Sequence, residues 1–427
     1  MALRDAVEAF ALSRLLVFGV AAYAMLTLDP RDPASGYAPP YGAKPIFGDA
    51  FEGWPLEGVF EALFHPLTQW DAGWYIGIAD EGYAPPEGAP PETQSRTAFF
   101  PLFPALIRIL GLGGSDGALI VASYAIAIGA LFAALYLLHR LTTIELGREP
   151  ARATVLLLAF FPTSFFLSAP YAESLFLALA IGSLYAARCD RWALAGALAG
   201  LATATRSAGL ALAPALLVMY LWGPRPEGTA LRERARAFLP RYRVRPDVLW
   251  IALSVVGVLA FTLYLEHAFA DGTRWVSAQS GWQRENALLA GTWEGAGSAV
   301  EAVRDLASGD RPPGGDPSGN DPFRLAARDV FLFTLLALAV VALIGTARRL
   351  PPAYAVFAAL TLVPAVSSPE ESEALKAFSR YVLAAFPLFM WAGAVCAGPR
   401  ASLRAVAACA VVLGLLTAQF ATVQWVA

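Results

Sequence analysis

The sequence predicts an all-α membrane protein that crosses the bilayer many times. Of its 427 residues, 57% are hydrophobic and only 15% are charged, and the mean hydropathy is +0.54. A soluble domain carries about 45–50% apolar and about 25% charged residues. The apolar residues also gather in runs close to the roughly 20 residues that a helix needs to cross the hydrocarbon core. These observations exclude an ordinary soluble protein, and the net charge of −3 gives no reason to expect a nucleic-acid partner.

About eleven apolar segments are candidates for membrane-spanning helices, all within one integral membrane domain over residues 1–427. Several are short or interrupted by proline or glycine, which membrane helices tolerate when neighbours satisfy the freed backbone groups. The first segment follows Arg4 and Arg14 and could be a cleaved signal peptide, but its apolar run continues to Leu28, which favours a retained helix. In chain order the segments are residues 10–28, 118–138, 153–169, 172–187, 192–205, 206–222, 247–267, 329–347, 352–368, 380–398 and 403–425.

Arginines predict the orientation, because short cytoplasmic loops are enriched in basic residues. Sixteen arginines lie in five short connections, whereas residues 29–97 hold three basic and eleven acidic residues. We therefore expect the amino terminus and these connections in the cytoplasm. The membrane would be the plasma membrane in a prokaryote and the endoplasmic reticulum in a eukaryote. The arginines are Arg140, Arg148, Arg152, Arg188, Arg191, Arg225, Arg232, Arg234, Arg236, Arg241, Arg243, Arg245, Arg348, Arg349, Arg400 and Arg404.

Two large outer loops follow from this topology, residues 29–117 and 268–328. Within the first, the run FFPLFPALIRILGLG is too short and too proline-rich to span, so we expect a helix lying along the outer membrane surface. The second contains a turn-rich segment from Arg311 to Pro322. The chain has no evident internal repeat, which weakens the interpretation as an inverted-repeat transporter.

The cysteines and histidines suggest neither a disulfide framework nor a metal site. Cys189 lies in a short basic connection, and Cys396 and Cys409 lie in apolar segments, so all three are expected to be reduced thiols. No His or Cys spacing matches a zinc site. No metal and no cofactor are therefore expected.

The strongest chemical motif is QWDAGWYIGIADEGY, in which Asp71 lies between Trp70 and Trp74 and is followed by Tyr75. Aromatic walls exclude water and adjust the basicity of a carboxylate, which suits a general base that binds substrate between these rings. The alternatives are a helix N-cap for Asp71 and a membrane-interface belt for the aromatic residues. The acids at 80–81 are expected on a solvated helix surface.

Two charged residues stand in otherwise apolar hairpins. Glu173 is the first residue of an expected helix. Burying its charge in an apolar segment costs free energy unless the carboxylate is paired or faces an aqueous cavity. The alternative is stabilisation by the helix dipole. Arg206 requires an anion, either the Glu173 carboxylate or a substrate phosphate. Ser207 and Gly209 would allow backbone donors to approach the same anion.

Two further groups extend the candidate binding site. Arg380 and Tyr381 begin a helix at the outer face, where Lys376 could complete a cationic patch; the alternative is that Arg380 snorkels to lipid headgroups. In the second outer loop, Gln279 and Trp282 belong to a basic and aromatic mixture that would suit a sugar or a headgroup.

Taken in order, these segments resemble the PIG-V class of mannosyltransferases. The matching pieces are QWDAGWYIGIADEGY, AFFPLFP, SAPYAESLFLAL, ATRSAGLALAP and FSRYVLAAFPLF. That class has the GT-C fold and includes the second mannosyltransferase of glycosylphosphatidylinositol assembly. Ala208 stands where relatives often have Asn, residues 29–66 do not align, and residues 268–328 align only loosely.

The resemblance implies an enzyme that moves mannose from polyprenyl-phosphate-mannose to an acceptor hydroxyl on the non-cytoplasmic face. It places the catalytic acid of the first outer loop at Asp71, and it assigns the family's acidic hairpin and TRSxG-like stretch to Glu173, Arg206, Ser207 and Gly209. The expected partners are the donor lipid, membrane lipids, and a glycan, glycolipid or protein acceptor.

The expected mechanism is an inverting transfer. Asp71 accepts the acceptor proton while Arg206, with Arg380 as a second candidate, neutralises the leaving phosphate. One alternative is a lipid or solute carrier, which would place its polar residues near the bilayer midplane. Another is a scaffold subunit with a degenerate site.

Overall fold

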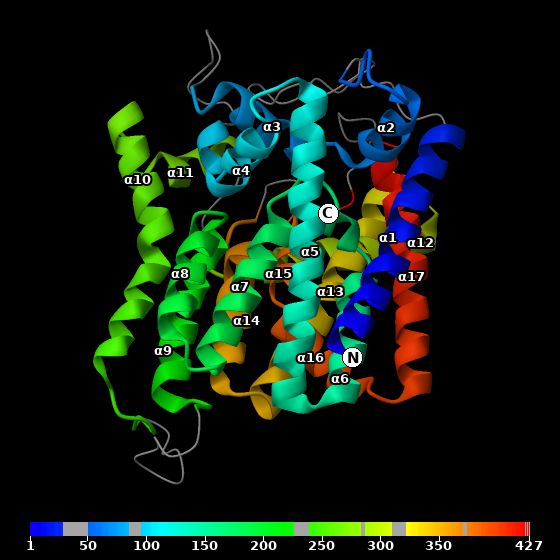
Figure 1. Ribbon diagram of the computed structural model, residues 1–427. Coiled ribbons are helices and arrows are strands. Elements are labelled where there is room, and N and C mark those ends of the chain that lie inside the picture. The colour runs from blue at the N-terminus through cyan, green and yellow to red at the C-terminus, as the bar shows by residue number, and fades with distance from the viewer. Residues whose placement is uncertain are drawn as a thin grey trace.

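A computed structural model describes residues 1–28, 50–84, 95–225, 239–282, 287–309, 322–369, 374–422, 424 and 426. Within these ranges the elements are α-helices and short 3-10 helices, packed as one bundle (Figure 1). The α-helices are α1 (Ala2–Thr27), α2 (Glu57–Phe64), α3 (Asp71–Glu81), α4 (Leu102–Leu110), α5 (Asp116–Leu146), α6 (Arg148–Ala159), α7 (Glu173–Arg188), α8 (Trp192–Thr203), α9 (Leu212–Trp222), α10 (Val256–Phe269), α11 (Arg274–Ser277), α12 (Ala290–Ser308), α13 (Pro322–Arg349), α14 (Pro352–Ser367), α15 (Phe378–Ala384), α16 (Pro387–Val395) and α17 (Pro399–Ala421). The 3-10 helices are η2 (His65–Leu67), η3 (Arg96–Ala98), η4 (Ser164–Leu167), η5 (Ser207–Ala211), η6 (Pro246–Val255) and η7 (Ala278–Trp282).

The expected all-α membrane architecture is confirmed. Each of the eleven apolar segments contains a helix. By length and composition, five helices of the described chain could cross a membrane: α1, α5, the continuous η6–α10, α13 and α17. The pair α15 and α16 makes a sixth if it is one span, bent by 78° at the break before Pro387. The shorter apolar helices are α8, η5–α9 and α14, so several expected spans are shorter than a helix that crosses the hydrocarbon core.

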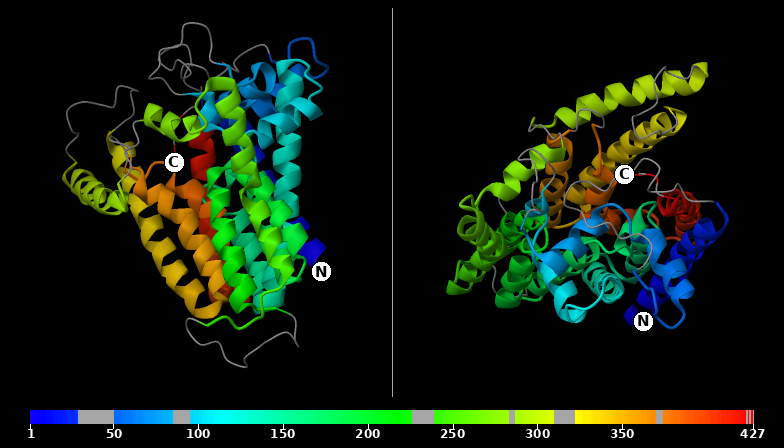
Figure 2. Two further views of the ribbon diagram at one scale, coloured as in Figure 1. Left: turned by 90° about the vertical axis from the view of Figure 1, so that its left-hand side faces the viewer. Right: turned by 90° about the horizontal axis from the view of Figure 1, so that it is seen from above.

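The two ends of the bundle differ in what they carry. The α5–α6, α13–α14 and α16–α17 connections lie at the lower end in Figure 1, while α2, α3, α4 and α11 gather at the upper end, as the side view in Figure 2 also shows. The lower connections belong to the arginine-rich set that the sequence predicts on one side. Hence the end of the bundle that carries these arginine-rich connections differs in structure from the end that carries α2, α3, α4 and α11.

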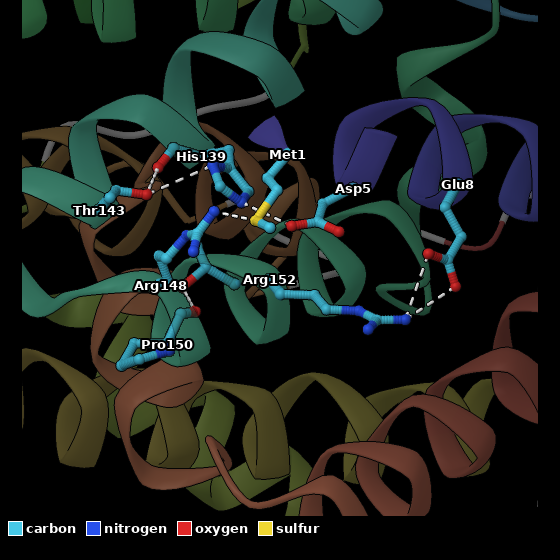
Figure 3. A network of polar contacts seen from close by, with 9 residues as sticks. Met1, Asp5, Glu8, His139, Thr143, Arg148, Pro150 and Arg152 are labelled. Carbon is cyan, nitrogen blue, oxygen red and sulfur yellow. Dashed lines mark hydrogen bonds and ion pairs between the residues drawn. The ribbon is translucent and has the colours of Figure 1, made fainter. Parts of the chain in front are cut away.

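At the arginine-rich end, α1 is fastened to α5 and α6 by a network of polar contacts (Figure 3). The His139 Nε2 atom lies 3.0 Å from Asp5 Oδ2, and Arg152 donates to Glu8 over 2.9 Å. Arg148 also contacts the Met1 sulfur. These contacts build the first helix into the bundle.

Further along α1, Arg14 is buried and donates to the Ala159 carbonyl over 2.8 Å and to the Ser164 carbonyl over 3.0 Å. Ala159 is the last residue of α6. The negative end of that helix dipole and two serine hydroxyls, from Ser164 and Ser168, therefore solvate the guanidinium inside the bundle.

Helix α8 approaches η6–α10 at backbone distance. A Cβ atom at Gly196 would overlap the Trp250 carbonyl oxygen, and one at Gly257 would overlap the Gly200 carbonyl oxygen. Small residues at such crossings let membrane helices pack closely. This crossing forms the side of the bundle next to α3 and α4 (Figure 1).

Candidate active site

Four charged side chains from distant parts of the sequence meet in one cluster. Arg380 Nη1 donates to Asp71 Oδ2 over 2.6 Å, and Arg380 Nε donates to Glu173 Oε1 over 2.6 Å. Arg206 forms an ion pair with the same Glu173 oxygen. The cluster contains two guanidinium groups and two carboxylates, so its formal charges are equal in number. We refer to Asp71, Glu173, Arg206 and Arg380 as the charged cluster.

Asp71 is placed by a strained turn. It is the first residue of α3, and Trp70 before it has φ 55° and ψ −112°, the dihedrals of the first central position of a type II′ turn. That position favours glycine, and a bulky residue there costs about 1–3 kcal/mol. The Ala72 amide closes the turn by donating to the Gln69 carbonyl over 3.2 Å. Asp71 does not cap the helix with its side chain, so the N-cap alternative is wrong.

The Tyr171 hydroxyl forms hydrogen bonds with the backbone of this turn on both sides of Trp70. It donates to the Gln69 carbonyl over 2.9 Å and accepts from the Asp71 amide over 3.2 Å. The Tyr171 ring also lies 4.9 Å from the Arg380 guanidinium carbon. One buried tyrosine therefore contacts both the backbone of Asp71 and the cation that pairs with it.

Glu173 and Arg380 are held on the interior side of the cluster. Glu173 begins α7, where the helix dipole favours a negative charge, so the dipole and the paired-carboxylate interpretations both apply. Arg380 on α15 lies 5.3 Å from the Phe166 ring centroid and is buried. Its guanidinium therefore does not snorkel to headgroups. Glu173 Oε2 is buried and has no hydrogen-bond partner among the described residues.

The four side chains of the charged cluster differ in how much of their surface is exposed. The side chains of Asp71 and Arg206 are 21% and 17% exposed, whereas those of Glu173 and Arg380 are 2% and 8% exposed. Asp71 and Arg206 are therefore the more exposed members of the cluster. Glu173, which the sequence predicts as a substrate ligand, forms ion pairs with both guanidinium groups.

The aromatic residues after Asp71 fix α3 against the segment before α4. Trp74 is buried and stacks on Phe99 with ring centroids 5.5 Å apart, and Tyr75 meets the edges of Phe99 and Phe103 at 5.1 Å each. Burial, followed by the charge of Glu173, raises the pKa of Tyr75 above its ordinary value, so the hydroxyl stays protonated. Trp74 therefore belongs to the core of this end of the protein, whereas Trp70 is half-buried next to Asp71.

The residues next to Arg206 differ in exposure and in what they contact. The Tyr381 ring centroid lies 5.7 Å from the Arg206 guanidinium carbon, and Ser207 is exposed at the start of η5. Gly209 donates its amide to the Arg206 carbonyl over 3.0 Å, and a Cβ there would collide with the backbone of Thr203. Gly209 thus serves close packing, and its amide is already used within the chain.

The candidates from the second outer loop are not joined to the cluster. Gln279 lies on η7, and no hydrogen bond or ion pair links it to the cluster among the residues that the structure describes. The Trp282 side chain lies outside the described residues. Of the acids expected on the helix surface, Glu81 is half exposed and pairs with Arg96, which fastens the end of α3 to η3.

The sequence does not single out Tyr171, whose hydroxyl contacts the backbone on both sides of Trp70. A tyrosine after proline near a membrane surface is also typical of an interfacial anchor, and its closeness in sequence to Glu173 is a weak signal of a place at the site.

Comparison with known proteins gives a family match. The profile of the family described as mannosyltransferase (PIG-V) matches residues 4–237, which is more than half of the chain and includes Asp71, Glu173 and Arg206. No match was found among curated proteins.

Solved structures of the Archaeoglobus fulgidus oligosaccharyltransferase are similar at low scores. The complex with Zn and sulfate has 14% identity and a TM-score of 0.45, covering 94% of this chain and 53% of that one. The apo form has 15% identity and a TM-score of 0.45, covering 96% and 56%. The complex with an inhibitory peptide and a dolichol-phosphate has 15% identity and a TM-score of 0.41, covering 96% and 55%. This chain thus spans about half the length of those chains, and the scores are too low to establish a common fold.

Proposed function

The chain belongs to the mannosyltransferase (PIG-V) family of glycosyltransferases, and from that premise we propose that it transfers mannose from polyprenyl-phosphate-mannose to an acceptor hydroxyl at the charged cluster. The observation that carries the proposal is the pairing of Asp71 with the Arg380 guanidinium, which shares the Glu173 carboxylate with Arg206. A lipid-phosphate glycosyl transfer needs both a proton acceptor and a cation for the leaving phosphate.

On the donor side, Arg206 is the group that would meet the phosphate. Its side chain is 17% exposed, and although Nη1 is buried against Glu173, the remaining guanidinium N–H groups would suit a phosphate. Arg380 lies on the other side of the shared Glu173 oxygen and adds a second positive charge. These two cations would stabilise the negative charge that develops on the phosphate as the bond to the sugar breaks.

On the acceptor side, Asp71 would act as the general base. Arg380 occupies Oδ2, which leaves Oδ1 to accept the proton of the acceptor hydroxyl. The hydroxyl oxygen then forms a bond to the anomeric carbon from the face opposite the phosphate, the bond from carbon to phosphate oxygen breaks, and its electron pair leaves with the lipid phosphate. The product has inverted configuration, and the proton remains on Asp71.

The position of α3 supports a site at the membrane surface. Helix α3 lies with α2 and α4 at the end of the bundle opposite the arginine-rich connections (Figure 1). With the amino terminus in the cytoplasm, that end faces the outside or the lumen. A donor lipid would then enter laterally from the outer leaflet.

The test is incubation of the purified protein with polyprenyl-phosphate-mannose, with and without candidate acceptors. Acceptor-dependent consumption of the donor by the wild-type protein, lost in Asp71→Asn, is the expected result. A wild-type protein that consumes no donor with any acceptor, but moves the intact lipid across a vesicle membrane, would establish a carrier instead.

A further inference from the structure

Arg14 is a buried cation in the first helix that the proposed mechanism does not use. It lies on α1 and is 4% exposed. A guanidinium has five N–H donors, and each of them is engaged: Nε donates to the Ser13 hydroxyl over 3.2 Å, and the two terminal nitrogens donate to Ala159, Ser164 and Ser168. All these acceptors are neutral oxygens, so Arg14 has no donor left for a substrate.

The acceptors of Arg14 gather in the connection between α6 and α7, residues 160–172, and at the last residue of α6. An arginine inside a membrane helix costs free energy unless its donors are satisfied, and α1 is long and apolar enough to cross a bilayer. Ser164 accepts from Arg14 through its carbonyl over 3.0 Å and through its hydroxyl over 3.1 Å. The same hydroxyl donates to the Ala159 carbonyl over 2.6 Å. One side chain of α1 therefore fixes the backbone of the α6–α7 connection.

This connection contacts the charged cluster through an aromatic ring. Phe166 is buried on η4, two residues after Ser164. Its ring stacks on Tyr171 with centroids 5.5 Å apart, and its centroid lies 5.3 Å from the Arg380 guanidinium carbon. Tyr171 in turn accepts from the Asp71 amide. A shift of η4 would therefore move the ring that Tyr171 and Arg380 both contact.

The same connection is bonded to the start of α7. The Leu167 carbonyl accepts from the Ser174 hydroxyl over 2.5 Å. Glu173 stands directly before Ser174 and is the first residue of α7. The carboxylate that pairs with both guanidinium groups thus begins a helix whose first turn is fastened to η4.

We propose that Arg14 is a positioning residue for the charged cluster. By holding the α6–α7 connection it sets the places of Tyr171 and Glu173, and through Tyr171 it sets the place of Asp71. Because its donors are all engaged within the chain, Arg14 acts through these residues and not on the substrate. The inference rests on the proposed function where transfer is the readout, and it adds α1 to the elements that build the site.

Arg14→Gln should lower kcat about 10-fold and leave the donor KM unchanged, because a reacting group held in the wrong place costs rate at constant binding. Arg225→Gln is the matched control, since that arginine is also buried and pairs with Asp190 beyond the other end of α7. It should lose stability while kcat per folded molecule stays at the wild-type value. A wild-type kcat in Arg14→Gln, or an equal loss of kcat in both variants, would overturn the proposal.

A milder change tests the same contact if Arg14→Gln does not fold. Ser168→Ala removes one acceptor of Arg14 and should lower kcat at constant donor KM. Ser183→Ala removes a buried hydroxyl that donates to the Ala195 carbonyl, and it should leave kcat unchanged. Combined with Tyr171→Phe, Ser168→Ala should lower kcat by less than the product of the two single losses, because both act on one chain of contacts. Losses that multiply would mean that Arg14 does not act through Tyr171.

A measurement without sugar transfer separates this inference from the proposed function. Hydrogen–deuterium exchange of the protein in phosphatidylcholine nanodiscs reports how firmly residues 160–174 and 68–76 are held. Arg14→Gln should speed exchange in both segments, whereas Arg225→Gln should leave both unchanged. Wild-type exchange of residues 160–174 in Arg14→Gln would overturn the positioning role, whatever the enzyme transfers. Faster exchange there, in a protein whose wild type transfers no mannose, would support the hold of Arg14 on the connection and refute the proposed function alone.

Discussion

Arg380 Nη1 lies 2.6 Å from Asp71 Oδ2, although 309 positions separate the two residues in the sequence. The ion pair joins the first turn of α3 to α15, and the Asp71 side chain stays 21% exposed beside it. The pair therefore links the architecture of the bundle to the chemistry proposed for it.

Asp71→Asn should keep the protein folded while removing most transfer. The amide retains the size of the side chain but cannot accept the acceptor proton, and a general base contributes about 100- to 10,000-fold in rate. Initial rates with saturating donor and acceptor measure the loss. Asp80→Asn, on the same helix, is the control and should stay near the wild-type rate; a near-normal rate for Asp71→Asn would end its assignment as base.

Arg206→Ala should weaken donor binding more than Arg206→Lys. Lysine keeps the charge but loses the planar fork that makes two parallel hydrogen bonds to a phosphate. The measurement is the Kd of each protein for polyprenyl phosphate. Equal affinity in the wild-type protein and both variants would count against phosphate binding at Arg206.

Tyr171→Phe should lower kcat about 10- to 100-fold and leave the donor KM unchanged, because a misplaced reacting group costs rate at constant binding. The change removes the hydroxyl that joins the Gln69 carbonyl to the Asp71 amide. Tyr124→Phe is matched to it, since that buried hydroxyl bonds to the Phe64 carbonyl and the Thr68 hydroxyl and not to the backbone of Gln69 or Asp71. If both variants lose stability and activity in parallel, Tyr171 supports the fold alone.

Glu173→Gln should destabilise the protein by about 3–5 kcal/mol, because it leaves two guanidinium groups in a buried site without their shared anion. Thermal melting in detergent is the measurement. The Glu81→Gln change breaks an ion pair with a half-exposed carboxylate and should cost no more than about 1 kcal/mol. Similar melting temperatures for the two variants would contradict the counter-charge role of Glu173.

The alkaline limb of the pH profile should not come from Tyr75. Burial and the charge of Glu173 raise the pKa of Tyr75, and for an acid a raised pKa means that the neutral form persists as pH increases. Tyr75→Phe should therefore leave the midpoint of the alkaline limb where it is in the wild-type protein. A shift of that midpoint in the variant would show that the wild-type hydroxyl ionises in the assay range.

The sequence predicted the helices and the main charged residues, because charges are expensive in apolar segments and stand out there. Glu173 and Arg206 stand out in this way, and their pairing is among the expectations. Asp71 is identified by the tryptophans that flank it, and Arg380 by its position at the start of an outer-face helix. A hydropathy profile shows which charged residues stand in apolar segments, and the residue type gives the sign of the charge. Together these are enough to single out such residues. They gave no reason to expect that Arg380 would bridge both acids.

Other features depend on the packing of neighbours that no sequence pattern specifies. Trp70 occupies a turn position that glycine usually fills, and the Tyr171 hydroxyl from another hairpin donates to the Gln69 carbonyl of that turn. Trp74 follows Asp71 by one helical turn, yet its ring stacks on Phe99 in the core. Gly209 next to Arg206 suggested anion binding, whereas its missing side chain makes room for α8.

The balance of two cations and two anions in the charged cluster bears on how a reaction cycle would end. When Asp71 takes up a proton, the cluster gains one unit of positive charge and holds the departing lipid phosphate more tightly. Once that proton passes to water, the restored carboxylate repels the phosphate from the same guanidinium groups. Proton loss from Asp71 and release of the spent carrier lipid would then be coupled.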